Sequence, residues 1–148
     1  MFSHMEDYQI IECDSEDLIK DTFKVMKQLH LHLDDSYVDL VQEMQRDKGY
    51  KLYACLTEKN ECIGVVGFVF ESRLSSGRII YLDDLVIDEA SRGLGVGSKL
   101  LDLVIENANQ QNCDAILLDC GNHRTESHQF YLKKGFDNTA LDFKMSLT

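Results

Sequence analysis

The residues whose type and spacing most clearly suggest a chemical role are three glycines, Gly93, Gly95 and Gly97. They follow one apolar run and precede another. Glycine lets the backbone approach a ligand closely, because no side chain stands in the way. The backbone N–H groups of Leu94 to Ser98 can therefore face one anion at the positive end of a helix dipole. The apolar residues that follow recur at helical spacing, so the segment predicts a phosphate-binding loop at a helix start.

Two other glycine-rich phosphate loops fit this segment less well. In the dinucleotide-binding pattern G-x-G-x-x-G, counting from Gly93 places Ser98 where the third glycine belongs, and the segment lies in mid-chain. A P-loop ends in Gly-Lys-Ser or Gly-Lys-Thr, and this loop does not. The pattern therefore excludes a P-loop and disfavours a dinucleotide fold.

A second motif, Asn-His-Arg-Thr-Glu-Ser-His-Gln-Phe-Tyr-Leu-Lys-Lys-Gly-Phe, occupies residues 122–136. Together with Arg92-x-x-Gly95-x-Gly97 it resembles the GNAT superfamily of N-acetyltransferases. The glycine motif matches that superfamily's acetyl-CoA pyrophosphate loop. The later motif matches its Asn-x-Arg-x-x-Ala-His-x-Phe-Tyr-x-x-x-Gly-Phe block, with Ser127 where alanine is usual. A weaker resemblance, in Gly-Ser-Lys-Leu-Leu and Phe-Tyr-Leu-Lys, is to the aminoalkylphosphonate N-acetyltransferase branch.

The resemblance implies that acetyl-CoA is the cosubstrate. It also implies that a strand over 79–87 splays from a strand over 115–119, so that the backbone near Leu85 to Ile87 pairs with the pantetheine arm. A backbone N–H there, at Val86 or a neighbour, would polarise the thioester carbonyl. The residues implied to bind the coenzyme are Leu85, Val86, Ile87, Arg92, Gly93, Leu94, Gly95, Val96, Gly97 and Ser98.

Acetyl transfer from a thioester to an amine also needs a neutral amine and a proton for the departing thiolate. Tyr131 matches the superfamily tyrosine that protonates the thiolate; the alternative role is a packed aromatic side chain. Tyr81 stands where many members carry a glutamate base. Strict alternation along a strand puts Asp83 on the face of Tyr81 and Asp84 on the other, so we expect Asp83 to be the base. The alternative is an acidic rim that only recognises an ammonium group.

The segment with His30, His32, Asp34 and Asp35 lies between two expected helices, in the region that lines the acceptor pocket in this superfamily. The histidine spacing does not suit a zinc site, so no metal is expected. A solvated loop with acidic, substrate-facing residues is the preferred interpretation. His128, Arg124 and Cys120 are assigned no catalytic role.

Composition restricts the partners. The chain has 148 residues and a net charge of −11, which repels nucleic acid and anionic membranes and attracts a cationic acceptor. No apolar stretch approaches the roughly 20 residues of a membrane span, and no leader pattern opens the chain, so a cytoplasmic protein is expected. Its five cysteines include no C-x-x-C pair, which favours reduced thiols. The expected partners are acetyl-CoA and a small-molecule amine, without nucleic acid or membrane, and a homodimer is compatible with the sequence.

The predicted fold class is α/β: a GNAT-like single domain over 1–148 with a mixed, mostly antiparallel central sheet flanked by about four helices. Alternation and β-rich composition predict strands over 8–13, 50–57, 62–70, 79–87, 115–118 and 141–147. Helical periodicity and cap residues predict helices over 15–30, from 37 onward, after Gly97, and over 125–134.

These features favour an acetyl-CoA-dependent N-acetyltransferase, an acyltransferase that moves the acetyl group to a primary amine of a small, cationic acceptor within a ternary complex. Polyamines, amino sugars and aminoalkyl compounds all suit the acidity of the chain. Two alternatives stay open: a noncatalytic acyl-CoA-binding sensor or interaction module, and a protein lysine acetyltransferase.

Overall fold

The computed structural model describes residues 7–121, 124–140 and 142–147. The chain forms two compact units, one ending at Leu117 and one beginning at Leu118. Three residues used in the sequence analysis lie outside the described ranges. They are Asn122 and His123 of the second motif and Leu141 of the expected last strand.

The first unit is built on a five-stranded sheet with the strands in sequence order. Neighbouring strands are antiparallel from β1 to β4, and β5 runs parallel to β4. This confirms the predicted mixed, mostly antiparallel sheet. The strands are β1 (Gln9–Glu12), β2 (Lys51–Leu56), β3 (Cys62–Arg73), β4 (Gly77–Ile87) and β5 (Ala115–Leu117).

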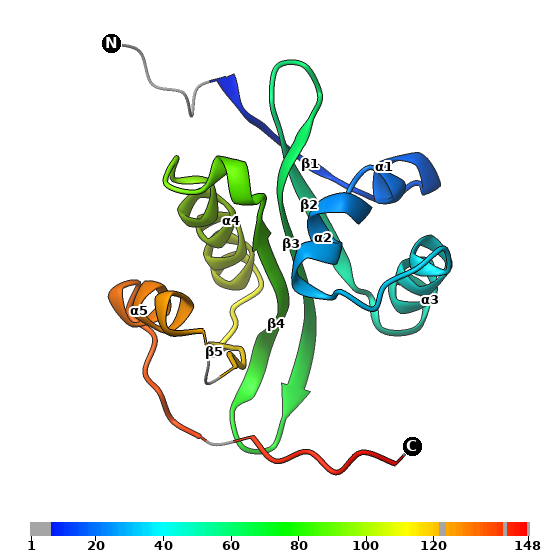
Figure 1. Cartoon of the computed structure of the whole chain (residues 1–148). Helices are drawn as coiled ribbons and strands as arrows, with labels where there is room; N and C mark the ends of the chain where they lie inside the picture. Colours follow the sequence, from blue (N-terminus) through cyan, green and yellow to red (C-terminus); the bar gives the residue numbers. More distant parts are fainter. Residues whose placement is uncertain (1–6, 122–123, 141, 148) are drawn as a thin grey trace. The chain divides into compact units, whose positions relative to one another are not determined.

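Helices cover both faces of this sheet (Figure 1). One face carries α1 (Glu16–Lys20), α2 (Phe23–Leu29) and α3 (Tyr37–Lys48), and the other carries α4 (Val96–Gln110). A short 3-10 turn, η2 (Glu89–Ser91), connects β4 to the loop before α4. Within the described part of the chain, no helix is long and apolar enough to cross a membrane.

The first helical segment differs from the expected single helix over 15–30. Ser15 caps α1 as predicted, since its side chain accepts a hydrogen bond from the N–H of Leu18. The helix then breaks at Thr22, whose hydroxyl donates to the carbonyl of Ile19 at 2.6 Å. A threonine hydroxyl that binds the backbone in this way competes with continued helix. The expected helix is therefore two, α1 and α2.

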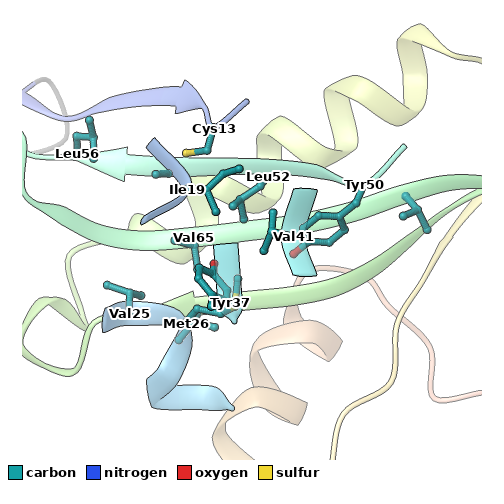
Figure 2. Close-up of a cluster of buried hydrophobic side chains, with 13 residues drawn as sticks. Cys13, Ile19, Val25, Met26, Tyr37, Val41, Tyr50, Leu52, Leu56 and Val65 are labelled. Carbon is teal, nitrogen blue, oxygen red and sulfur yellow. The ribbon is translucent and has the colours of Figure 1, made fainter. Parts of the chain in front are cut away.

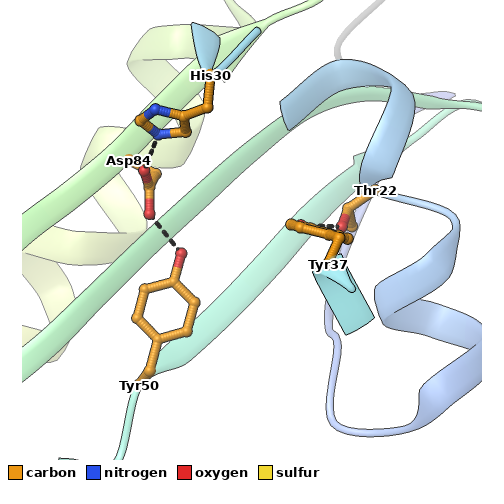
Figure 3. Close-up of polar contacts among 5 residues, drawn as sticks. All are labelled: Thr22, His30, Tyr37, Tyr50 and Asp84. Carbon is orange, nitrogen blue, oxygen red and sulfur yellow. Dashed lines mark hydrogen bonds and ion pairs between the residues drawn. The ribbon is translucent and has the colours of Figure 1, made fainter. Parts of the chain in front are cut away.

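One hydrophobic core cluster of the first unit lies between the sheet and α1 to α3, and it is almost entirely apolar (Figure 2). Tyr37 and Tyr50 are exceptions, because each brings a phenol hydroxyl into this buried region. Buried hydroxyls require hydrogen-bond partners. The Tyr37 hydroxyl lies 2.7 Å from Thr22 Oγ1 and donates to it, since the threonine proton is already given to Ile19 (Figure 3). The partner of Tyr50 is described with the site.

The second unit contains α5 (Thr125–Lys133), as predicted. The expected strand over 141–147 is wrong for the residues described, because 142–147 form no strand. Apolar residues do alternate there, but alternation produces a strand only when the backbone finds a pairing partner and one face is buried. Neither condition holds in this segment, where Phe143 and Met145 are 93% and 84% exposed.

Candidate active site

The glycine loop connects η2, which follows β4, to α4. Gly93 and Gly95 have φ angles of 83° and 82°, a left-handed conformation that L side chains rarely adopt. Gly95 is also the N-cap of α4, and no side chain caps the helix there. The first turn therefore presents the N–H groups of Val96, Gly97 and Ser98 ahead of the first intrahelical bond, from the Lys99 N–H to the Gly95 carbonyl. Such a helix start is suited to an anion.

Only part of one edge of β4 pairs with β5. The ladder between β4 and β5 covers only Ile79 to Tyr81 of β4, paired with Ala115 to Leu117. Farther along, Leu85 to Ile87 pair with β3 through Val66 to Gly64. This segment extends beyond the β4–β5 ladder, toward the glycine loop. The edge facing away from β3 therefore suits pairing with an extended ligand.

The two aspartates on β4 flank an irregularity that the sequence does not reveal. Gly67 of β3 pairs with Asp84 and Phe68 pairs with Leu82, so Asp83 is the additional residue of a β-bulge. A bulge breaks the alternation of side chains. Tyr81 lies opposite Val69 and Asp84 lies opposite Gly67, and Val69 and Gly67 are two residues apart on β3. Tyr81 and Asp84 are therefore on the same face of the sheet. The prediction that Asp84 lies on the face opposite Tyr81 is wrong, because this register places Asp84 on the face of Tyr81.

Asp84 is held by hydrogen bonds at both carboxylate oxygens (Figure 3). Its Oδ1 lies 2.6 Å from Nε2 of His30, the C-cap residue of α2, and its Oδ2 accepts from the Tyr50 hydroxyl at 2.6 Å. The side chain of Asp84 is 12% exposed, whereas that of His30 is 36% exposed. The three residues form a chain of contacts that runs from the core to the surface.

Tyr50 is the buried end of this chain. Burial, followed by the negative charge of Asp84 and the hydrogen bond to it, raises the pKa of Tyr50 well above its usual value. The phenol therefore keeps its proton and donates. Gly67 leaves room for this contact, because a Cβ on Gly67 would overlap the Tyr50 hydroxyl and lie 2.8 Å from Cε1.

A second contact connects α2 to the glycine loop. The side-chain amide of Gln28 donates to Asp88 Oδ1 at 2.8 Å, and its carbonyl accepts from the N–H of Glu89 at 3.1 Å. Asp88 in turn caps η2 by accepting from the N–H of Ala90. The last turn of α2 thus bonds to β4 through His30 and to the start of the loop through Gln28.

Tyr131 lies on α5 in the second unit, where its ring packs edge-on against two aromatic neighbours. The ring centroids of Phe130 and Phe136 are 5.3 Å and 5.5 Å away. Burial, with a smaller effect of Cys120, raises the pKa of Tyr131 to about 12. The phenol is therefore protonated at neutral pH and able to donate. His128 has a structural contact, since its Nε2 lies 3.0 Å from the Gly121 carbonyl oxygen.

Comparison with known proteins identifies the family. Residues 16–136 match the Acetyltransferase (GNAT) family, which is more than half of the chain. The chain belongs to the GNAT family. A curated relative, glucosamine 6-phosphate N-acetyltransferase 1 of Oryza sativa subsp. japonica, is 33% identical over 60 residues, which are 40% of this chain and 34% of the relative. The chain thus matches about one third of the length of this relative.

Solved GNAT structures share the fold. A glucosamine-6-phosphate N-acetyltransferase from Arabidopsis thaliana has a TM-score of 0.77 at 19% identity, covering 95% of this chain and 99% of that chain. An aminoglycoside N-acetyltransferase in complex with CoA has a TM-score of 0.80 at 17% identity, covering 95% of both chains. An acetyltransferase from Trypanosoma brucei has a TM-score of 0.80 at 19% identity, covering 95% of this chain and all of its own. At these identities the likeness concerns the fold.

His30 and Tyr50 both bind an aspartate of β4, which the sequence did not predict. His30 was placed in the acceptor region, but nothing local indicates its contact with a residue 54 positions later. For Tyr50 the available signal was indirect: a glycine at position 67 within a β-rich run is typical of close approach by another group. Among the residues that the structure describes, no three His, Cys, Asp or Glu side chains gather as a metal site.

Proposed function

We propose that this protein is an acetyl-CoA-dependent N-acetyltransferase that moves the acetyl group to the primary amine of a small acceptor within a ternary complex. One observation carries the proposal: in a chain of the GNAT family, α4 begins at a left-handed glycine cap with no side-chain capping hydrogen bond, in the loop that follows a bulged strand and η2. A polyanionic coenzyme suits that helix start.

In this proposal the glycine loop holds the coenzyme pyrophosphate. The N–H groups of residues 94–98 donate to it, and Arg92 adds a positive charge at the loop start. The pantetheine arm pairs with β4 at Leu85 to Ile87, and an N–H at Val86 or its neighbour polarises the thioester carbonyl. The buried Val96 side chain, 1% exposed, anchors this helix start in the core of the first unit.

Tyr131 is proposed as the acid that gives a proton to the departing thiolate. Its place in the family motif and a pKa raised by burial to about 12 both support a protonated phenol. Once the C–S bond breaks, the thiolate accepts that proton. Solvent then restores the phenol.

The acceptor is proposed to be a small, cationic amine. The net charge of −11 favours positively charged compounds over nucleic acids and anionic surfaces. The curated relatives are named for glucosamine 6-phosphate, an amino sugar, and one structural neighbour is named for aminoglycosides. Both are small amines, so amino sugars belong in the first panel together with polyamines and aminoalkyl compounds.

The test is release of free CoA thiol from acetyl-CoA in the presence of an amine panel. The panel contains a polyamine, glucosamine with and without its 6-phosphate, an aminoglycoside, an aminoalkylphosphonate and a lysine peptide. Thiol release with a small amine, and none without amine, supports the proposal. CoA binding without turnover on any amine indicates the sensor alternative, and turnover confined to the peptide indicates a protein acetyltransferase.

A further inference from the structure

Asp84 and its partner His30 differ in how accessible they are to a proton from a substrate. Both oxygens of Asp84 are already in hydrogen bonds, and its side chain is only 12% exposed. A carboxylate that already accepts a hydrogen bond at each oxygen and is this little exposed is less accessible to a substrate proton than a more exposed imidazole. The imidazole of His30 is 36% exposed and has a second ring nitrogen, Nδ1.

We propose that His30 is the catalytic base for the acceptor amine, and that Asp84 and Tyr50 are positioning residues that hold its ring. The inference rests on the proposed acetyltransferase function. It replaces both β4 aspartates as the proton acceptor. The same order of groups, carboxylate to imidazole to substrate, fixes the imidazole tautomer in hydrolytic triads.

Each contact has a defined part in this arrangement. The Tyr50 hydroxyl donates to Asp84 Oδ2 and fixes the plane of the carboxylate. Asp84 Oδ1 then accepts from Nε2–H of His30 at 2.6 Å. A carboxylate on Nε2–H favours the tautomer in which Nδ1 carries the lone pair, and it stabilises the imidazolium once Nδ1 is protonated.

The proton and bond changes balance as follows. The acceptor arrives as R–NH₃⁺ and gives one proton to Nδ1 of His30, directly or through a water, which leaves a lone pair on nitrogen. That lone pair forms the N–C bond to the thioester carbonyl, and the C–S bond then breaks. The nitrogen loses its second proton as the thiolate gains one. His30 returns its proton to solvent, so each turnover releases one proton with the amide and free CoA.

Other titratable groups around the ring must be separated from His30 in any pH experiment. From the segment after α2 comes His32, whose ring centroid is 6.2 Å from that of His30. Lys27 and Asp34 act on the same region, since Lys27 and His32 both help to lower the pKa of Asp34 after its hydrogen bonds with Ser36. From β4 and α3 come Asp83 and Tyr37, both of which act on Tyr50. His32 is exposed and makes the matched control.

The experiment measures kcat/KM against pH for wild type, His30→Gln and His32→Gln, with an amine that wild type acetylates and under conditions limited by chemistry. We expect His30→Gln to lose about 10²-fold or more at neutral pH and to recover as pH approaches the pKa of the amine, because free amine then needs no base. His32→Gln should keep the wild-type profile. Exogenous imidazole should restore part of the activity of His30→Ala, a rescue that a purely structural role would not give.

A second arm tests the positioning residues. In wild type, the ¹⁵N chemical shifts of His30 should show the proton on Nε2, and Asp84→Asn should change that tautomer and lower kcat while CoA affinity is retained. Tyr50→Phe should have a smaller effect in the same direction. Asp83→Asn should leave unchanged the part of the kcat/KM profile in which activity rises with pH as the base loses its proton.

Three results overturn the inference. The first is that folded His30→Gln and wild type have superimposable pH profiles of kcat/KM. The second is that Asp83→Asn, instead of His30→Gln, loses the rise of kcat/KM with pH, and the third is that the proton of neutral His30 lies on Nδ1. Each of them leaves acetyl transfer by wild type intact. Failure of wild type to release CoA thiol with any amine is a different outcome, because it overturns the proposed function and this inference together.

Discussion

A single methyl group at Gly67 should disturb both the stability and the chemistry of this protein. Gly67 lies in the middle of β3, opposite Asp84, and the Tyr50 ring covers it. A Cβ at this position would overlap the phenol hydroxyl, and the ring belongs to a side chain only 3% exposed. Gly67→Ala therefore forces the ring away from Asp84 within a packed core.

The expected cost follows from two effects on the same side chain. Overpacking a core typically costs about 1–3 kcal/mol. A hydrogen bond to a charged partner, here from Tyr50 to Asp84 at 2.6 Å, contributes about 1.5–3 kcal/mol. Because one displaced ring causes both losses, they overlap, and removing a glycine from a strand returns about 0.5–1 kcal/mol. We expect Gly67→Ala to lower the free energy of unfolding by about 2–4 kcal/mol.

The assay is a double-mutant cycle with Tyr50→Phe, followed by urea unfolding. The chain contains no tryptophan, so far-UV circular dichroism reports the transition. In Tyr50→Phe the hydrogen bond and the nearest clashing atom are already gone, so Gly67→Ala should cost about 1–2 kcal/mol less there than in wild type. Gly64→Ala is the matched control on β3. Its Cβ would lie 2.8 Å from Val96 Cγ1 and 3.1 Å from Leu100 Cδ1, side chains of α4.

Gly64→Ala should therefore destabilise the protein without coupling to Tyr50→Phe. The reasoning about Gly67 would be refuted by a cycle that is additive within about 0.5 kcal/mol, the spread usual for independent sites. A coupling at Gly64 as large as that at Gly67 would refute it equally. In a folded Gly67→Ala protein, the pH profile should also move toward that of Tyr50→Phe.

Four further outcomes are expected. Gly95→Val should abolish CoA binding in calorimetric titration while the protein stays folded, because a β-branched residue is strained at φ 82° and covers the α4 N-terminus; near-native affinity would remove the loop from the site. Tyr131→Phe should lower chemistry-limited turnover by about 10²–10⁴-fold with CoA affinity nearly unchanged; wild-type turnover would leave only a packing role. Gln28→Ala removes two hydrogen bonds to the loop start and should weaken CoA binding by about tenfold; an unchanged dissociation constant would show that the loop holds without it. Burial raises the pKa of Tyr37 from its usual 10 to about 12, so its contribution to stability is complete below pH 10 and is lost as pH rises toward about 12; urea midpoints should fall across that range less in Tyr37→Phe than in wild type.

The sequence predicted the helices and strands whose apolar residues repeat at regular spacing within a single segment. The positions of α3, α4 and α5, of the strands β2 and β3, and of the glycine loop before α4 all follow from local pattern. Such patterns depend on short-range geometry and on one buried face, so the residues themselves carry the signal. The break between α1 and α2 depends instead on Thr22 and its buried partner Tyr37, 15 positions later, which periodicity does not reveal.

The candidate site was harder to predict because its key feature is a mismatch between two strands. Read alone, the segment from Tyr81 to Asp84 alternates and places Asp83 toward the acceptor side. The extra residue exists only relative to β3, where Gly67 pairs with Asp84 and Phe68 with Leu82. No pattern within β4 reports this shift, because a bulge belongs to the pairing of two strands.

The bulge also explains why one turn of α2 can contact both parts of the candidate site. By turning Asp84 toward α2, it gives His30 a partner at the helix C-terminus, while Gln28, half a turn earlier, bonds Asp88 where β4 ends. The proposed base and the start of the proposed coenzyme loop are thus attached to the same short helix. Since His30 and Gln28 lie on one rigid turn, a displacement of either contact should alter the other.

Gln28→Ala should therefore lower kcat as well as CoA affinity, whereas Lys24→Ala, an exposed position on the same helix, should change neither. A Gln28→Ala protein that binds CoA weakly yet turns over normally at saturation would show that the two contacts are independent.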